Sequence, residues 1–356
     1  MKKTALIMAG GRGERFWPRS RKQLPKQFLS LTDDGKTMIQ LTVERILPLV
    51  EMEDIYIATN RDYLPLVREQ LPKVPVNNII CEPVGRNTAP CIALGAALIS
   101  SKYEDAVMMV LPSDHLIRYN GMFQTTLADA CEIAEKEDNL VTVGITPDHP
   151  ETGYGYIQFS GEDPVGRAFR VKHFVEKPTL EKAKEYLAED DYLWNSGMFV
   201  WKISSVMERF RELMPDVYEG VLKIRDAYGD GTGEDALNRI FPDFPSISID
   251  YGVMERSDHI YTIPGTFGWD DVGSWLAVER IKQSNEAGNI VNGNVITIDT
   301  RNCIIQADRK LIATVGLKDL VIVDTEDATL ICEKGSCADI KKVLENLRIC
   351  NRNEYL

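Results

Sequence analysis

Short apolar, β-rich runs alternate with helix-length amphipathic segments through the first 143 residues of the chain. Predicted strands occupy residues 4–9, 54–59, 78–81, 106–111 and 140–144, and predicted helices lie near residues 38–50, 63–71, 89–102 and 123–137. This strict alternation predicts an α/β fold, a Rossmann-like mixed, mostly parallel sheet with helices on both faces. Such sheets bind ligands beyond the carboxyl ends of their strands, so the loops that follow the strands are expected to be functional.

The pattern changes twice further along the chain. Residues 150–284 mix strands at 169–176 and 197–201 with helices at 180–189 and 204–228, which predicts a second half of the same domain. Five short strands follow at 294–299, 302–306, 311–315, 320–324 and 328–332, and then a helix at 338–349. Strands that recur about every nine residues indicate a small β-solenoid or a meander. We therefore predict one domain over 1–288, with halves of about 1–149 and 150–288, and a β-rich tail with a terminal helix over 289–356.

The composition excludes several classes of protein. Among 356 residues, 41 Lys and Arg face 54 Asp and Glu, a net charge of −13 that argues against nucleic-acid binding, which needs a basic surface. No apolar run has the roughly 20 residues needed to cross a bilayer. The apolar run at the N-terminus is too short for a signal peptide and predicts a strand. Seven scattered cysteines without a C-x-x-C pair indicate free thiols in a reducing cytoplasm rather than zinc or disulfides.

The first predicted strand ends in a glycine-rich loop that contains Gly10, Gly11 and Gly13, with Arg15 and Lys26 close behind. Glycines let the backbone approach a ligand closely and point N–H groups at phosphate oxygens. The two cations would add charge to such a site. The loop is neither a Walker A sequence nor G-x-G-x-x-G. A simple glycine-rich turn with surface cations is an equally good interpretation of the glycines alone.

Six motifs are spread along the chain: G-G-x-G-x-R with P-K (Gly10 to Lys26), EPVGRNTAP (82–90), LPSDH (111–115), FVEKP (174–178), WNSGMF (194–199) and GWDDVGSW (268–275). In these motifs the chain resembles the sugar-phosphate nucleotidyltransferases and, more narrowly, their mannose-1-phosphate guanylyltransferase branch. The motifs follow the family order across most of the predicted domain, and the strand-rich tail resembles the left-handed β-helix of that family.

The resemblance implies transfer of GMP from GTP to mannose 1-phosphate, giving GDP-mannose and pyrophosphate. It further implies dependence on Mg²⁺, direct attack of the sugar phosphate on the α-phosphorus, a cytoplasmic location and a homodimer. Nucleic-acid and membrane partners are not expected, because of the acidic charge balance and the absence of long apolar runs. Some relatives carry a phosphomannose isomerase domain. Because only about 20 residues follow the predicted β-helix, that activity is expected to be absent here.

The resemblance also assigns catalytic residues. Arg15 is expected to hold the β and γ phosphates and Lys26 the α-phosphate, while Asp114 and Asp271 are expected to bind the metal. Mg²⁺ suits one or two carboxylates completed by water and phosphate oxygens. From spacing alone, Asp114 could equally form a cap or turn and Asp271 an Asx-turn. The choice between Asp270 and Asp271 as the ligand stays open.

Two further groups of residues are expected to bind substrate. The predicted nucleotide-binding residues are Ala9, Gly10, Gly11, Gly13, Glu82, Asn87, Thr88 and Ser113, and the predicted sugar-phosphate-binding residues are Gly153, Glu176, Lys177 and Asn195. Glu82 could accept the two adjacent donors of guanine, although its loop could simply start a helix, with Thr88 as the cap. Lys177 could instead be a solvated lysine, and Gly153 with Gly155 a plain turn.

Three rival functions remain open at this level. One is the same chemistry on another pair, such as glucose 1-phosphate with UTP or dTTP, because base or epimer preference can depend on one or two pocket residues. A second is a non-catalytic nucleotide-sugar sensor, which would not need the complete set of cations and carboxylates. The third is an acyltransferase acting through the β-solenoid, which the small number of strands and the absence of an evident catalytic histidine there disfavour.

Overall fold

The computed structural model describes residues 1–11 and 13–356. It divides into two compact units that each draw on several stretches of the chain. Unit 1 comprises Met1–Gly10, Val43–Ser113 and Ile117–Trp269, and unit 2 comprises Gly11–Thr42, Asp114–Leu116 and Asp270–Leu356. The glycine-rich loop after the first strand therefore belongs to the same unit as the C-terminal tail.

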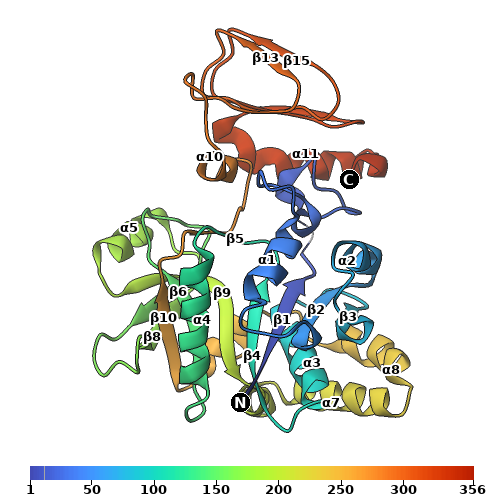
Figure 1. Ribbon diagram of the computed structural model, residues 1–356, viewed down its shortest axis with the longest axis vertical. Helices are drawn as coiled ribbons and strands as arrows, with labels where there is room; N and C mark the ends of the chain where they lie inside the picture. The colour runs from blue at the N-terminus through green and yellow to red at the C-terminus, as the bar shows by residue number, and fades with distance from the viewer. Residues whose placement is uncertain (12) are drawn as a thin grey trace. The chain divides into compact units, whose positions relative to one another are not determined.

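Unit 1 is built on one nine-stranded sheet with the order β3-β2-β1-β4-β9-β6-β10-β8-β7 (Figure 1). The strands are β1 (Lys2–Ala9), β2 (Ile55–Asn60), β3 (Ile79–Glu82), β4 (Ala106–Pro112), β6 (Leu140–Ile145), β7 (Tyr156–Phe159), β8 (Phe169–Val175), β9 (Tyr192–Lys202) and β10 (Ile260–Gly265). Pairing is parallel from β3 to β4 and between β6 and β10, and antiparallel where β9, β8 and β7 take part. The predicted mixed α/β sheet is confirmed.

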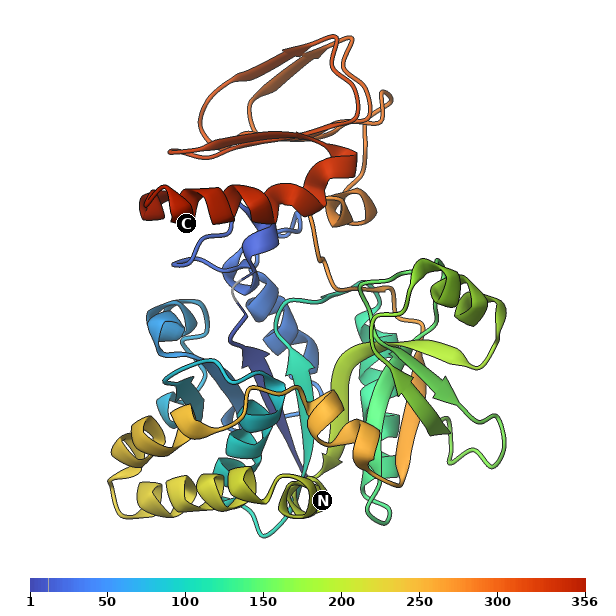
Figure 2. The ribbon, with the colours of Figure 1, turned by 180° about the vertical axis from the view of Figure 1, so that it is seen from behind.

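Helices cover both faces of this sheet (Figures 1 and 2). Unit 1 contains α2 (Leu64–Gln70), α3 (Thr88–Ser100), α4 (Asn120–Ala134), α5 (Leu180–Ala188), α6 (Ile203–Leu213), α7 (Pro215–Gly229), α8 (Gly233–Ile240) and α9 (Ile249–Gly252); α1 (Met38–Ile46) begins in unit 2 and ends in unit 1. The face of β1 that carries Leu6 packs against α3, where Gly95 leaves room for that leucine. On the opposite face, Arg45 at the end of α1 donates to Asn120 of α4 over 3.0 Å.

One predicted helix differs from the structure, and one strand of the large sheet was missed. The single helix expected over 204–228 is two helices, α6 and α7, which meet at Pro215. Proline lacks the N–H that would continue a helix but fits its first turn, so it ends one helix and starts the next. Strand β10 was not predicted at all, although it pairs with both β6 and β8 within the sheet. Its Pro264 interrupts the β-rich pattern that would have revealed it.

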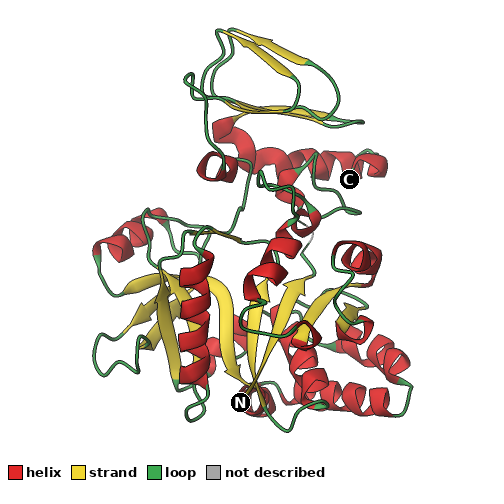
Figure 3. Cartoon of the chain, in the orientation of Figure 1, coloured by secondary structure: helices red, strands yellow, loops and turns green. Residues whose placement is uncertain are grey.

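Unit 2 contains the β-rich tail (Figure 3). Its strands are β12 (Ile290–Asn292), β13 (Val295–Ile298), β14 (Ile304–Gln306), β15 (Ile312–Val315), β16 (Leu320–Asp324) and β17 (Thr329–Glu333), preceded by α10 (Ala277–Ile281) and followed by α11 (Ile340–Ile349). Successive turns stack in parallel, with Ile290 opposite Ile304 and Ile304 opposite Val321. The predicted solenoid is therefore present, closed by the antiparallel pair β16–β17. Two further short strands, β5 (Leu116–Ile117) and β11 (Trp269–Asp270), pair with each other.

A hydrophobic cluster in unit 2 joins the N-terminal loop to the last helix. Phe16 and Trp17 pack in this cluster with Trp275 and with Leu344 of α11. The rings of Phe16 and Trp275 lie 5.1 Å apart, and the Trp275 indole donates to the carbonyl of Trp17 over 3.0 Å. The loop after β1 is thus held on a packed base, which fixes the polar side chains that it carries. Within the described part of the chain, no helix is both long and apolar enough to span a membrane.

Candidate active site

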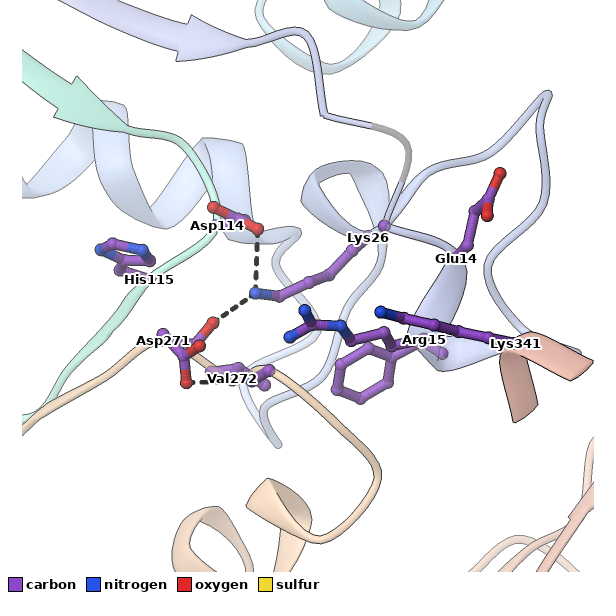
Figure 4. A pocket seen from close by; sticks show the side chains of 11 residues that line it. Glu14, Arg15, Lys26, Asp114, His115, Asp271, Val272 and Lys341 are labelled. Carbon is purple, nitrogen blue, oxygen red and sulfur yellow. Dashed lines mark hydrogen bonds and ion pairs between the residues drawn. The ribbon is translucent and has the colours of Figure 1, made fainter. Parts of the chain in front are cut away.

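A cavity in unit 2, with a volume of about 480 Å³, contains the four charged residues that were predicted to be catalytic (Figure 4). Its lining residues are Gly13, Glu14, Arg15, Phe16, Lys26, Asp114, His115, Asp271, Val272, Gly273 and Lys341. All four predicted catalytic residues are among them, although they come from three separate segments of the chain. The cavity combines cations, which suit phosphate groups, with carboxylates, which suit a metal ion.

Lys26 lies at the centre of this cavity and is almost fully buried. Its Nζ atom is 2.9 Å from Oδ2 of Asp114 and donates a hydrogen bond to the backbone carbonyl of Asp271 over 2.5 Å. Burial raises the pKa of Asp114, but the charges of Lys26 and His115 and the hydrogen bond from Lys26 outweigh it, so the pKa lies below its ordinary value. Asp114 is therefore a carboxylate at neutral pH, poised to bind a cation.

The conformation of Gly13 is required for the position of Lys26. Gly13 has a φ of +58°, in the left-handed region that favours glycine. A Cβ atom on Gly13 would lie 2.5 Å from Cβ of Lys26 and 2.6 Å from its backbone nitrogen. Any other residue would displace the lysine, so this glycine has a packing role, and its expected phosphate-binding role stays a prediction. Arg12 lies outside the described residues.

The structure distinguishes the two adjacent aspartates. Asp270 is buried, and its carboxylate accepts hydrogen bonds from the Arg280 guanidinium and from the backbone N–H of Val272. Asp271 accepts the N–H of Gly273 over 3.1 Å, which is an Asx-turn, and its side chain lines the cavity. The Asx-turn is therefore present, and the same carboxylate also faces the cavity, so the metal-binding role of Asp271 stays a prediction. Asp270 is held by Arg280 instead.

His115 lines the same cavity, directly after Asp114. Burial is the largest effect on its imidazole and lowers the pKa, and the charge of nearby Lys26 acts in the same direction. The attraction of Asp114 opposes these effects without cancelling them. The ring is therefore neutral at pH 7, which suits hydrogen bonding within the loop better than charge neutralisation of a phosphate.

The donor set tests whether a metal ion fits. Among the described residues, no group of three or more histidine, cysteine, aspartate or glutamate side chains is arranged to hold a metal. Asp114 and Asp271 are instead a pair in one cavity. Mg²⁺ is commonly bound by one or two carboxylates plus waters and substrate phosphates, so the pair fits a metal that arrives with a nucleotide.

In unit 1, Glu82 ends β3 as a buried carboxyl group with only 6% of its surface exposed. A Cβ on Gly10 would lie 3.6 Å from its Oε2 atom, so the glycine-rich end of β1 lies beside it. Burial raises the pKa of Glu82 to about 7, although a hydrogen bond from the Cys91 thiol has the opposite effect and lowers the pKa. Its Oε1 atom has no hydrogen-bond partner among the described residues. Such an oxygen is costly to bury unless a ligand donates to it.

The other predicted nucleotide-binding residues in unit 1 have structural partners. Asn87 caps α3 by accepting the N–H of Thr88, so the helix start is real, but the expected cap, Thr88, is not the one that forms. Thr88 Oγ1 instead accepts the N–H of Ile249 over 2.8 Å. The carbonyl of Ala9 accepts the Thr59 hydroxyl, and the N–H of Ser113 donates to the carbonyl of Met8.

The predicted sugar-phosphate residues partly gather in unit 1, together with one that was not predicted. Asn195 Nδ2 donates to Oδ1 of Asp250 over 2.7 Å. Lys177 pairs with Glu176, and a Cβ on Gly155 would lie 2.7 Å from Oε2 of Glu176. Burial raises the pKa of Asp250, which also experiences the charge of Glu176. Asp250 lies two residues after Ser248, whose side chain caps the short helix α9. The only sequence signal for this segment was a serine in a position to cap a helix.

Gly153 does not join this group through a contact. Its N–H donates to Oε1 of Glu151 two residues earlier, over 2.7 Å, and the glycine is exposed. Gly153 therefore forms the plain turn that was the alternative interpretation of the sequence. Gly155 is the glycine whose backbone lies close to the carboxylate of Glu176.

Comparison with known proteins places the chain in a family. The model of the "Nucleotidyl transferase" family matches residues 4–287, and that of the "MannoseP isomerase/GMP-like beta-helix domain" matches residues 293–347. Mannose-1-phosphate guanylyltransferases of Salmonella montevideo and Escherichia coli are 41% and 42% identical, over 99% and 98% of this chain and 75% and 74% of theirs. A Thermus thermophilus crystal structure, described as a mannose-1-phosphate geranyltransferase, superimposes with a TM-score of 0.87 at 36% identity, covering 98% of this chain and all of that one. Enzymes of this kind generally use a divalent metal ion. The chain is a member of the nucleotidyl transferase family, with a β-helix domain at its C-terminal end.

Proposed function

We propose that this enzyme is a Mg²⁺-dependent, cytoplasmic mannose-1-phosphate guanylyltransferase. A phosphate oxygen of mannose 1-phosphate attacks the α-phosphorus of GTP, a new P–O bond forms, and the bond to the β-phosphate breaks with its electron pair leaving on pyrophosphate. The nucleophile is already an anion, so no general base is required. The observation that carries the proposal is the cavity in which Arg15 and Lys26 accompany Asp114 and Asp271. The named relatives supply the substrate pair.

The roles follow from charge and position. Phosphoryl and nucleotidyl transfer depend mainly on positioning and charge neutralisation. Arg15 and the glycine-loop amides would hold the outer phosphates, and Lys26 would face the α-phosphate. Asp114 and Asp271 would hold the Mg²⁺, which supplies further neutralisation of the phosphate charge when bound. In unit 1, Glu176, Lys177, Asn195 and, as an addition from the structure, Asp250 would bind the sugar phosphate.

The test is pyrophosphate release from each of GTP, ATP, UTP and dTTP, with mannose 1-phosphate or glucose 1-phosphate, with and without Mg²⁺. Release with GTP, mannose 1-phosphate and Mg²⁺ at a kcat/KM well above every other pair is expected. A preference for another pair would discard the substrate assignment while leaving the chemistry in place. Nucleotide binding without release from any pair would favour a sensor over an enzyme.

We infer that Glu82 recognises guanine, because its buried Oε1 atom lacks a donor among the described residues and guanine offers two adjacent ones. Only the ionised carboxylate accepts both donors, and its pKa is about 7. The Kd for GTP is therefore expected to be constant above about pH 7 and to rise below it, approaching tenfold per pH unit. Because this folded pKa exceeds the ordinary value of 4.5, ionisation of Glu82 also lowers the stability of the nucleotide-free protein as the pH rises from about 4.5 to 7.

The matched variant for this prediction is Glu82→Gln. It keeps the shape, does not titrate, and is expected to weaken GTP binding by about 10-fold to 100-fold above pH 7. The γ-phosphate of GTP titrates equally with both proteins, so the ratio of the two Kd values isolates Glu82. A ratio that stays constant between pH 6 and pH 8 would show that Glu82 does not contact the base.

An exposed apolar face on the β-rich tail favours a homodimer. On the outer face of the β13–β15 pair, Ile296, Ile298 and Val315 are each more than half exposed, with Ile298 directly opposite Val315. Contiguous exposed apolar side chains are typical of interaction surfaces. Light scattering is expected to give twice the chain mass, and the Ile298→Lys variant the mass of a single chain.

A further inference from the structure

Lys341 is the one lining residue of the unit 2 cavity that comes from the C-terminal helix. Figure 4 shows its side chain extending from α11 into the cavity alongside Arg15. The last family motif in the sequence ends at residue 275, so Lys341 lies outside all of the motifs. It joins a cavity that already contains Arg15 and Lys26, which makes three cations around one space.

Lys341 is exposed, and within the described residues no carboxylate pairs with it, unlike its neighbours on the helix. The next residue, Lys342, pairs with Asp339 over 2.9 Å, and Arg348 on the same helix pairs with Glu14 over 2.7 Å. No ion pair involves Lys341 or Arg15 in the described part of the chain, whereas Lys334 of the same unit pairs with Glu279. Lys341 is also the second residue of α11, where the helix dipole disfavours a cation. An anion between Lys341 and Arg15 would relieve both effects.

The helix is held firmly against the loop that carries Arg15. Ile340 and Leu344 of α11 are buried in the cluster that contains Phe16. Beyond the helix, the carbonyl of Tyr355 accepts the Trp17 indole N–H over 2.7 Å and also a hydrogen bond from Arg21. The backbone that carries Lys341 is therefore held in place by the buried residues of α11 and by the contacts of Tyr355. A preorganised phosphate ligand needs a backbone that is held in this way.

We propose that Lys341 binds the β and γ phosphates of the nucleoside triphosphate together with Arg15, so that the C-terminal helix forms part of the active site. This deepens the function proposed above and rests on it. When the bond between the α- and β-phosphates breaks, its electron pair moves to the departing pyrophosphate, and negative charge grows on the β-phosphate oxygen. An ammonium group at that position stabilises the leaving group without accepting a proton.

The test compares Lys341→Met with Lys342→Met, the neighbouring helix lysine that does not line the cavity. Lys341→Met is expected to raise the inhibition constant of pyrophosphate and to lower kcat/KM for GTP, each by about 10-fold to 100-fold. The Kd for GDP-mannose, which lacks the outer two phosphates, should stay within twofold of the unmodified enzyme. Lys341→Arg should recover most of the loss, and Lys342→Met should change none of these values by more than twofold.

A second measurement separates this proposal from the enzyme assignment. Calorimetry with inorganic pyrophosphate and Mg²⁺ needs no turnover, and the Lys341→Met variant is expected to lose at least tenfold in affinity even if the sugar or base preference proves different. Its melting temperature without ligand should be unchanged or higher, because the exposed Lys341 has no ion pair to lose and the helix dipole disfavours a cation in the first turn. Pyrophosphate affinity within twofold of the unmodified enzyme, or an equal loss in Lys342→Met or in GDP-mannose binding, would overturn the role of Lys341.

Discussion

Replacing Lys26 by methionine is expected to lower kcat by about 10²-fold to 10³-fold, the usual effect of removing one preorganised group that stabilises transition-state charge. The Lys26 ammonium is nearly buried and lies between Asp114 and the carbonyl of Asp271, so neither water nor a flexible side chain can take its place. Methionine keeps most of the aliphatic stem, so the packing against Gly13 is retained. Steady-state and single-turnover assays with GTP and mannose 1-phosphate measure the change.

Lys22→Met is the control for this prediction, because Lys22 is an exposed lysine on the same loop that does not line the cavity. It should keep kcat within about twofold. The melting temperatures of both variants show whether a loss of activity reflects unfolding. Turnover of Lys26→Met within a few-fold of the unmodified enzyme, with the fold intact, would remove Lys26 from the mechanism.

Asp271→Asn is expected to lower kcat by about 10²-fold or more and to raise the Mg²⁺ concentration needed for half-maximal activity, since metal ions typically supply several kcal/mol of charge stabilisation. Asparagine can still accept the N–H of Gly273, so the turn is preserved and the change is confined to charge. A magnesium titration of turnover, together with a thermal melt, measures both quantities.

Asp270→Asn is the matched control for this variant. It should lower the stability of the protein and leave its magnesium dependence nearly unchanged. Its carboxylate is buried against Arg280, whose side chain is partly exposed, so the loss is expected to be about 1–2 kcal/mol of stability. The half-saturating Mg²⁺ concentration of the folded enzyme should stay within a few-fold. A larger magnesium shift in Asp270→Asn than in Asp271→Asn would reverse the assignment of the metal ligand.

The strands of the first half of the chain were predictable because they are short, nearly continuous apolar runs of strand length that alternate with helical segments. Predicted strands at 4–9, 54–59, 78–81, 106–111 and 140–144 correspond to β1, β2, β3, β4 and β6. The elements of the later part were harder to predict, because there the local sequence pattern does not match the secondary structure that forms. Pro264 interrupts the pattern of a strand within the sheet, and the run over 204–228 continues its helical period through Pro215.

The sequence alone determined those features that follow from local chemistry: the β–α alternation, the glycine-rich loop after the first strand, and the residue types of a site for phosphate and metal. Only the tertiary structure decided which side chains meet. Arg280 pairs with Asp270 rather than Asp271, Asp250 joins Asn195, and Lys341 enters the cavity of Arg15. Each of these contacts joins residues that are separated along the chain. Such contacts arise from the packing of whole elements, and the periodicity of a short segment contains no information about its distant partners.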